Sequence, residues 1–206
     1  MLMEFSKKVI YKGVKKSWKD IIKESMKNDN YKKIKEKILS TKNIIYPNYD
    51  NIFETFKYFD LEDTKVVIIG QDCYINHIIK DTIVIPQANG MCFSVSSEHK
   101  TPPSLKNIFK ELDETIDEFT IPTSGDLSRW VKEEKVLLLN AALTVEAGKS
   151  NSHANLWTPV QIILLKKYQI KPKILFSFCG GILLKQKQNL LIKVNTRLFL
   201  EFIHHL

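Results

Sequence analysis

The chain has 206 residues, a hydrophobic fraction of 44% and a formal net charge of +8, values that fit one globular domain and exclude a disordered chain. Its apolar runs are shorter than the roughly 18 residues of a membrane span, and we expect no secretory signal. The positive charge suits a partner that carries phosphates. The cysteines, at positions 73, 92 and 179, are odd in number and lack a CxxC pattern, which favours reduced intracellular thiols and argues against a zinc site or disulfide framework.

The first third of the chain predicts helices after a short basic extension (1–16). Residues 17–38, "SWKDIIKESMKNDNYKKIKEKI", place apolar positions at helical spacing and predict one or two amphipathic helices with solvated charged faces. In residues 44–59, "IIYPNYDNIFETFKYF", a Pro-Asn turn precedes apolar residues spaced for one face of a helix. Those apolar residues are Ile52, Phe53, Phe56 and Phe59.

Four apolar runs, each followed by polar residues or glycine, carry most of the information. They are "VVII" (66–69), "VLLL" (136–139), "ILFSF" (174–178) and "LFLEF" (198–202). Helix-like segments lie between them, "SLKNIFKELDETI" (104–116) and "TPVQIILLKKY" (158–168). Alternation of this kind predicts an α/β fold with a parallel sheet, in which ligands bind at the carboxyl ends of the strands.

Asp72 and Asn140 follow two of these runs, a glycine pair follows the third and histidines follow the last. Any one of them can be explained as an ordinary turn residue. Four endings with different hydrogen-bonding capabilities instead indicate side chains that converge on one crevice. This pattern alone does not identify a reaction.

Several longer segments resemble the family 1 uracil-DNA glycosylases, in the order that the family has them. They are "GQDCY" (70–74), "QANGMCFSV" (87–95), "PPSLKNIFKEL" (102–112), "GDLSRW" (125–130) and "VLLLNAALTVEAGKSNSH" (136–153). The resemblance covers about residues 17 to 179. It implies a single domain over 1–206, with a three-layer α/β/α architecture and a central, four-stranded, mainly parallel sheet.

The activity implied is hydrolysis of the N-glycosidic bond of uracil in DNA, the first step of base excision repair, with no metal or organic cofactor. The partner would be single- or double-stranded DNA that contains uracil. The resemblance further implies a monomer that acts inside the cell, in cytoplasm or nucleus, without a membrane.

The catalytic residues implied by the resemblance are Asp72 and a histidine near the end of the sequence. A carboxylate beside the sugar stabilises an oxocarbenium-like transition state and can orient the attacking water. A histidine would donate a hydrogen bond to uracil O2, and we favour His204 over His205. We expect His153 to be structural.

The resemblance assigns the recognition of the base to residues from three segments. Phe93 would stack on the extruded ring, although a core aromatic is the alternative explanation. The amide of Asn140 would pair with uracil O4 and N3–H and reject cytosine. Tyr74 would exclude the thymine methyl group, and Gln71 would contribute mostly backbone hydrogen bonds.

Two further segments resemble the loops with which the family grips the DNA backbone. Pro102, Pro103 and Ser104 lie in the first, and Gly180 and Gly181 lie in the second. Backbone N–H groups and a hydroxyl suit phosphate contacts. A Pro-Pro pair is also a good helix start, so both interpretations of this pair stay open.

The sequence departs from the family pattern beside the catalytic loop. Cys73 replaces a proline, and "INHIIKDTIVIP" (75–86) is an insertion that could form a hairpin, cover the site or contact a partner. We expect His77 and His99 to be loop residues.

The end of the sequence also departs from the family, whose last loop reads His-Pro-Ser-Pro-Leu-Ser and uses its leucine as a wedge in the DNA. This chain reads "HHL" there. We expect a premature end, as in a frameshifted or decaying gene copy, and reduced activity, most of all on duplex DNA. Two alternatives stay open: a non-catalytic DNA-binding or replication-partner protein that retains the fold, and an unstable gene product.

Overall fold

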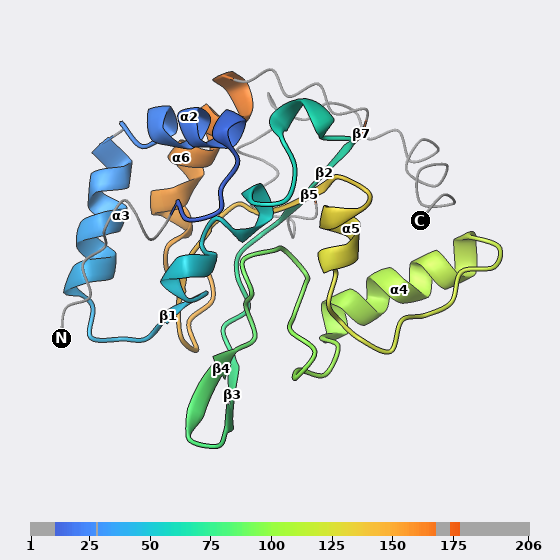
Figure 1. Cartoon of the computed structure of the whole chain (residues 1–206). Helices are drawn as coiled ribbons and strands as arrows, with labels where there is room; N and C mark the ends of the chain where they lie inside the picture. The colour runs from blue at the N-terminus through green and yellow to red at the C-terminus, as the bar shows by residue number, and fades with distance from the viewer. Residues whose placement is uncertain (1–10, 28, 168–173, 178–206) are drawn as a thin grey trace.

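A parallel sheet forms the centre of the computed structural model, which describes residues 11–27, 29–167 and 174–177 (Figure 1). Its strands are β2 (Val66–Gly70), β5 (Val136–Asn140) and β7 (Ile174–Ser177), in the order β5-β2-β7. Both neighbours run parallel to β2. The predicted α/β class is therefore confirmed. The fourth apolar run, 198–202, lies outside the described residues.

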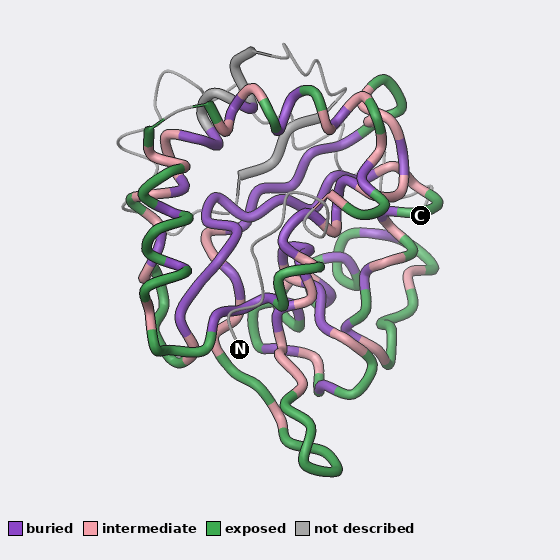
Figure 2. Tube along the Cα trace, turned by 60° about the vertical axis from the view of Figure 1, so that its left-hand side comes forward, coloured by how far each residue is buried: buried purple, intermediate pink, exposed green. Residues whose placement is uncertain are grey.

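Strands β2 and β5 form because their apolar runs suit a sheet that is covered on both faces. Every residue of β2 and β5 is buried (Figure 2). The register places Val66 opposite Val136 and Gly70 opposite Asn140. The carboxyl ends of both strands therefore lie at the same edge of the sheet.

Helices lie on either side of these strands (Figure 1). On one side are α2 (Lys16–Ser25), α3 (Asp29–Ser40) and α6 (Ala154–Lys167), and on the other are α4 (Pro103–Thr115) and α5 (Ser128–Lys132). Both α2 and α3 pack against α6, and α5 packs against β5. The helices predicted within residues 17–38, 104–116 and 158–168 are confirmed, with two formed from residues 17–38. Within the described part of the chain, no helix has the length and apolarity needed to cross a bilayer.

The apolar face of α2 shows how these helices are attached. Trp18, Ile21 and Ile22 are buried, and the Trp18 indole N–H donates a hydrogen bond of 2.9 Å to the Phe59 carbonyl. Burial of such side chains contributes about 1.5–3 kcal/mol each. The apolar positions of the amphipathic pattern in the sequence thus form the face of α2 that packs against the core.

The prediction of a helix around residues 52–59 is wrong. This segment contains the short 3-10 turns η1 (Tyr49–Asn51) and η2 (Glu54–Phe56), followed by η3 (Leu61–Asp63). Its polar groups bond to other elements: the Phe56 carbonyl accepts from the Lys15 N–H, and the Thr55 hydroxyl accepts from the Leu138 N–H. These tertiary bonds compete with a continuous helix, while the apolar side chains that suggested a helix are still buried.

A second, antiparallel pair joins β1 (Ile45–Tyr46) to β6 (Val145–Glu146). Glu146 is only 3% exposed, and its carboxylate lies 3.0 Å from the ammonium groups of Lys37 and Lys149 and 2.7 Å from the Asn43 amide. These donors, led by Lys149 and Lys37, lower the pKa of Glu146 from 4.5 to about 2. The carboxylate therefore ties α3 to the loop before α6.

Replacing Glu146 with glutamine is expected to lower the free energy of unfolding at pH 7 by about 1–3 kcal/mol, because charge-assisted bonds are lost in a buried site. The folded pKa is depressed, so this stabilisation is complete above about pH 4.5 and is lost as the pH falls towards about 2. Urea unfolding should show that the difference in free energy of unfolding between the wild-type and Glu146→Gln proteins is smaller at pH 3 than at pH 7. Glu133→Gln, which removes an exposed partner of Arg129, is the matched control and should change little at either pH.

The inserted segment forms a hairpin of β3 (His77–Lys80) and β4 (Ile83–Pro86), which projects from the body (Figures 1 and 2). His77 is therefore in a strand, and its prediction as a loop residue is wrong, because the insertion pairs with itself. His99 is in a loop, as predicted, and its Nε2 lies 3.2 Å from the Ile85 carbonyl.

Candidate functional site

The ends of β2 and β5 bring two segments into direct contact. A Cβ added to Gly70 would lie 2.7 Å from Asn140 Oδ1 and 2.9 Å from Cys92 Cβ. Pairing also continues past the strands, since the Ala142 N–H donates to the Gln71 carbonyl at 3.1 Å. Only glycine at position 70 leaves room for the Asn140 amide at this edge.

Asp72 follows this contact and is held by the loop that precedes α6. Its Oδ2 accepts hydrogen bonds from the Asn151 N–H at 2.6 Å and from the Ser150 hydroxyl at 3.0 Å. The Gln71 side-chain amide donates to Asn151 Oδ1 at 2.8 Å, which strengthens the link between the two loops. Two donors on one oxygen fix the position of the carboxylate.

Asn140 is 5% exposed, and its polar groups are bonded on two sides. Its Nδ2 donates to Cys73 Sγ at 3.5 Å, and its backbone carbonyl accepts from the Gln161 side chain at 3.0 Å. Burial, followed by the negative charge of Asp72, raises the pKa of the Cys73 thiol. Cys73 is therefore a neutral thiol, which accepts from Asn140 and donates to the Ala142 carbonyl.

Phe93 is brought to the same edge by the segment 87–95. The Cys92 N–H donates to the Leu138 carbonyl at 3.2 Å, which fastens this segment to β5. Phe93 has a φ of 61° and is partly buried against the core, and its Cε2 would lie 3.7 Å from a Cβ on Gly70. Its ring thus lies beside the strand ends, where a base could stack.

Gly90 allows the segment 87–95 to approach the chain that precedes β2. Its φ is 91°, and a Cβ there would lie 1.9 Å from the Asn51 carbonyl oxygen. The Asn89 side chain then accepts from the Met91 N–H and donates to the Ser94 hydroxyl. Glycine and asparagine in "QANGM" are therefore explained by backbone geometry.

The hydroxyl of Tyr74 joins three segments of the site. It donates to the Phe93 carbonyl at 3.2 Å and lies 2.9 Å from the Ser104 hydroxyl. Burial raises the pKa of Tyr74 to about 12, and the Ser104 hydrogen bond opposes that rise only in part. Tyr74 is therefore a neutral phenol. Pro103 begins α4, so the helix-start interpretation of the Pro-Pro pair is confirmed, and Ser104 is exposed in its first turn.

The structure therefore gathers most of the predicted site residues at one edge of the sheet. These are Gln71, Asp72, Tyr74, Phe93, Asn140 and the loop residues Pro102, Pro103 and Ser104. Their roles in binding and catalysis stay predictions. His204, His205, Gly180 and Gly181 lie outside the described residues. His153 is buried, with Nδ1 2.9 Å from the Thr144 hydroxyl, which fits the predicted structural role.

Two residues that hold Asp72 were missed from the sequence. Ser150 and Asn151 lie in "GKSNSH" (148–153), a turn ahead of a helix-like segment. Asn151 has a φ of 59°, a conformation that asparagine adopts more readily than most residues. That turn composition was the available signal, but it does not indicate which side chain the turn contacts.

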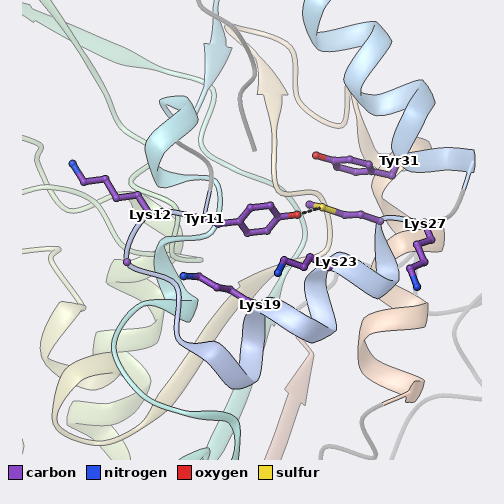
Figure 3. A pocket seen from close by; sticks show the side chains of 8 residues that line it. Tyr11, Lys12, Lys19, Lys23, Lys27 and Tyr31 are labelled. Atoms are coloured by element: carbon purple, nitrogen blue, oxygen red, sulfur yellow. Dashed lines mark hydrogen bonds between the residues drawn. The ribbon is translucent and has the colours of Figure 1, made fainter. Parts of the chain in front are cut away.

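A cavity of about 770 Å³ lies away from this edge, between residues 11–13, α2 and the start of α3 (Figure 3). Tyr11 and Tyr31 line it, and the Tyr11 hydroxyl donates to Met26 Sδ at 2.5 Å. Lysine side chains surround it, and none of the residues gathered at the sheet edge lines it. Among the described residues, no cluster of three His, Cys, Asp or Glu side chains could hold a metal ion.

Comparison with known proteins gives this arrangement a family. The family model described as the uracil DNA glycosylase superfamily matches residues 56–204. A protein named uracil-DNA glycosylase from Francisella philomiragia subsp. philomiragia is 39% identical over 193 residues, which cover 91% of this chain and 84% of that protein. The family match spans β2, β5 and the described loops at their carboxyl ends.

Solved structures share the fold. The crystal structure of mimivirus uracil-DNA glycosylase superposes with a TM-score of 0.73 at 24% identity and covers 91% of this chain and 67% of that one. The wild-type UNG from Nitratifractor salsuginis superposes with a TM-score of 0.60 at 17% identity and covers 88% of this chain and 81% of that one. On the family match and the 39% identity, the chain belongs to the uracil-DNA glycosylase superfamily.

Proposed function

We propose that the chain hydrolyses the N-glycosidic bond of uracil in DNA and so begins base excision repair. One observation carries the proposal: an acidic, an aromatic, an amide and a phenolic side chain, from three segments of the chain, meet at the carboxyl edge of a parallel sheet. The relative from Francisella philomiragia that is named for this activity supports it. Because its substrate is DNA, we expect the chain to act inside the cell.

Recognition of uracil is assigned to Asn140, Phe93 and Tyr74. The Asn140 amide is buried and fixed, so it can pair with uracil O4 and N3–H without reorganising, whereas cytosine presents the opposite pattern. The Phe93 ring would stack on the extruded base, which contributes about 1–3 kcal/mol towards the cost of unstacking. Tyr74, held at its hydroxyl by the Phe93 carbonyl, would contact C5 and exclude a methyl group.

The chemical step is assigned to Asp72. As the bond between C1′ and N1 breaks, its electron pair leaves with uracil and the sugar becomes oxocarbenium-like. The carboxylate would stabilise that cation and orient a water, whose oxygen bonds to C1′ and whose proton is released. We assign to His204 the hydrogen bond to uracil O2 that stabilises the departing anion, which is then protonated.

The DNA backbone is assigned to the loops around this edge. The Ser104 hydroxyl is exposed and lies 2.9 Å from the Tyr74 hydroxyl, so a phosphate bound there would lie beside the base pocket. Pro102 and Pro103 set the direction of this loop, and Gly180 and Gly181 are assigned to a second backbone contact.

Free uracil released from a uracil-containing oligonucleotide, measured by mass spectrometry, tests the proposal. We expect release from single-stranded and duplex substrates, and none from oligonucleotides that carry thymine or cytosine instead. Binding of DNA without release of uracil would contradict this proposal and support a non-catalytic DNA-binding protein. A binding-only protein would lose affinity steeply with salt.

A further inference from the structure

The proposed chemistry does not use the β3–β4 hairpin. Its strands pair from His77 with Pro86 to Lys80 with Ile83. Asp81 and Thr82 form the turn between them, with φ values of 49° and 67°. Two positive φ values in a two-residue turn match the twist of the strands, so the hairpin is a regular ribbon rather than a loose loop.

The hairpin exposes large apolar side chains. Ile79 is 69% exposed, Ile83 is 64% exposed and Val84 is 39% exposed. A two-stranded ribbon gains little stability from its own packing, and an exposed apolar ribbon invites association. Ile79 pairs with Val84 on one face of the ribbon and Ile83 pairs with Lys80 on the other, so both faces carry exposed apolar side chains. Exposed apolar side chains on a projection indicate a surface that binds something.

Hydrogen bonds at the base of the hairpin connect it to the loops of the site. The Ile75 carbonyl accepts a hydrogen bond of 2.9 Å from the N–H of Gly148, and Gly148 belongs to the loop that also holds Asp72. His99 belongs to the loop that leads to Pro102, and its Nε2 lies 3.2 and 3.1 Å from the carbonyl oxygens of Ile85 and Pro86 in β4. The hairpin therefore stands between the carboxylate loop and the predicted phosphate-binding loop.

We propose that the β3–β4 hairpin is a duplex-DNA contact, with Ile79 and Ile83 packing against bases and sugars beside the extruded nucleotide. This inference rests on the proposed function for the location of the DNA. The hairpin begins at His77, three positions after Tyr74, so it projects from the same loop that a duplex bound at Asp72 would contact. A two-stranded ribbon is narrow enough to enter a groove, and apolar side chains can wedge between base steps.

Position favours DNA over a protein as the occupant, because the base of the hairpin is bonded to loops on both sides of the proposed site. Lys80 is exposed in the strand pair next to the turn, where it can reach a phosphate, and Lys100 is exposed on the loop bonded to the hairpin base. The acidic side chains of Asp81 and Glu98 are exposed beside them. The whole chain carries a formal net charge of +8. Exposed apolar side chains with a lysine within reach of a phosphate suit a stacked, polyanionic partner.

The test replaces both isoleucines in the full chain, as Ile79→Ser with Ile83→Ser, and measures Kd by fluorescence anisotropy for undamaged duplex and for single-stranded DNA. We expect the Kd for duplex to rise about tenfold and the Kd for single strands to change less than about twofold. Where uracil release occurs, kcat/KM on duplex should fall by a similar factor, with little change on single strands. Ile44→Ser with Ile121→Ser removes two isoleucines that are 53% and 48% exposed outside the hairpin and should leave both Kd values unchanged.

Three results would overturn the inference. The first is an unchanged Kd for duplex, and the second is an equal loss on duplex and single strands. The third is a wild-type dimer that the substitutions dissociate in sedimentation, which would make the hairpin a contact between two copies. The binding measurements need no turnover, so a chain that released no uracil would refute the proposed function while this test remained decisive.

Discussion

Replacing Asp72 with asparagine is expected to lower the rate of uracil release by about 10²–10³-fold, because the transition state loses a fixed negative charge beside its cationic sugar. The amide has nearly the same shape, and its oxygen can still accept from the Asn151 N–H that now lies 2.6 Å from Asp72 Oδ2. The pocket for the base should therefore persist. Single-turnover release of uracil from a single-stranded oligonucleotide measures this effect without a contribution from duplex opening.

Asp126→Asn is the matched control for this substitution. Asp126 is also an exposed-loop carboxylate that accepts from a backbone N–H, that of Ser128 at 2.8 Å, but it does not belong to the site. The control should retain the wild-type rate. An Asp72→Asn protein that kept more than about a third of the wild-type rate would show that the negative charge of Asp72 does not contribute to catalysis as proposed. The same conclusion would follow if the Asp72→Asn protein no longer bound uracil-containing DNA, because Asp72 would then act in binding.

Replacing Asn140 with alanine is expected to lower kcat/KM by about 10²-fold or more, because uracil would enter a pocket with no partner for O4 and N3–H. Discrimination against cytosine should shrink at the same time. Rates of release from uracil- and cytosine-containing oligonucleotides measure both effects. Asn155→Ala, at an exposed position of α6, is the control and should alter neither rate.

Gly70→Ala tests the same amide without removing it. The new Cβ would meet Asn140 Oδ1 at 2.7 Å and Cys92 Cβ at 2.9 Å, so the amide or the strand end must shift. We expect kcat/KM for uracil release to fall towards the value expected for the Asn140→Ala protein. An alanine protein with full activity would mean that the pocket tolerates a displaced amide, contrary to the fixed geometry described above.

The parallel strands could be predicted because their signal is local. "VVII" and "VLLL" are continuous apolar runs, and residues that follow parallel strands meet at one edge, which is why Asp72 and Asn140 were found. The helix expected at 52–59 failed because Thr55 and Phe56 bond to distant backbone groups. A sequence window contains the apolar spacing but not those partners.

The contacts that hold the carboxylate could not be predicted for a related reason. Ser150 is separated from Asp72 by 78 positions, and the bond between them exists only after β5 and the following loop have folded against β2. The inserted segment was easier to interpret, since "INHIIKDTIVIP" (75–86) allowed a hairpin among other possibilities, and the structure shows the hairpin. The types of residue in the sequence therefore indicated the chemistry of the site, but which side chains contact one another became clear only from the folded structure.

A titration of isotope-labelled protein with free uracil tests the central claim most directly, namely that segments distant in sequence form one pocket for this base. The account predicts that the side-chain NH₂ signals of Asn140 and the ring signals of Phe93 and Tyr74 shift together along one binding curve. Thymine and cytosine should leave them unmoved. Shifts that were absent at Asn140, or that were alike for all three bases, would contradict the account.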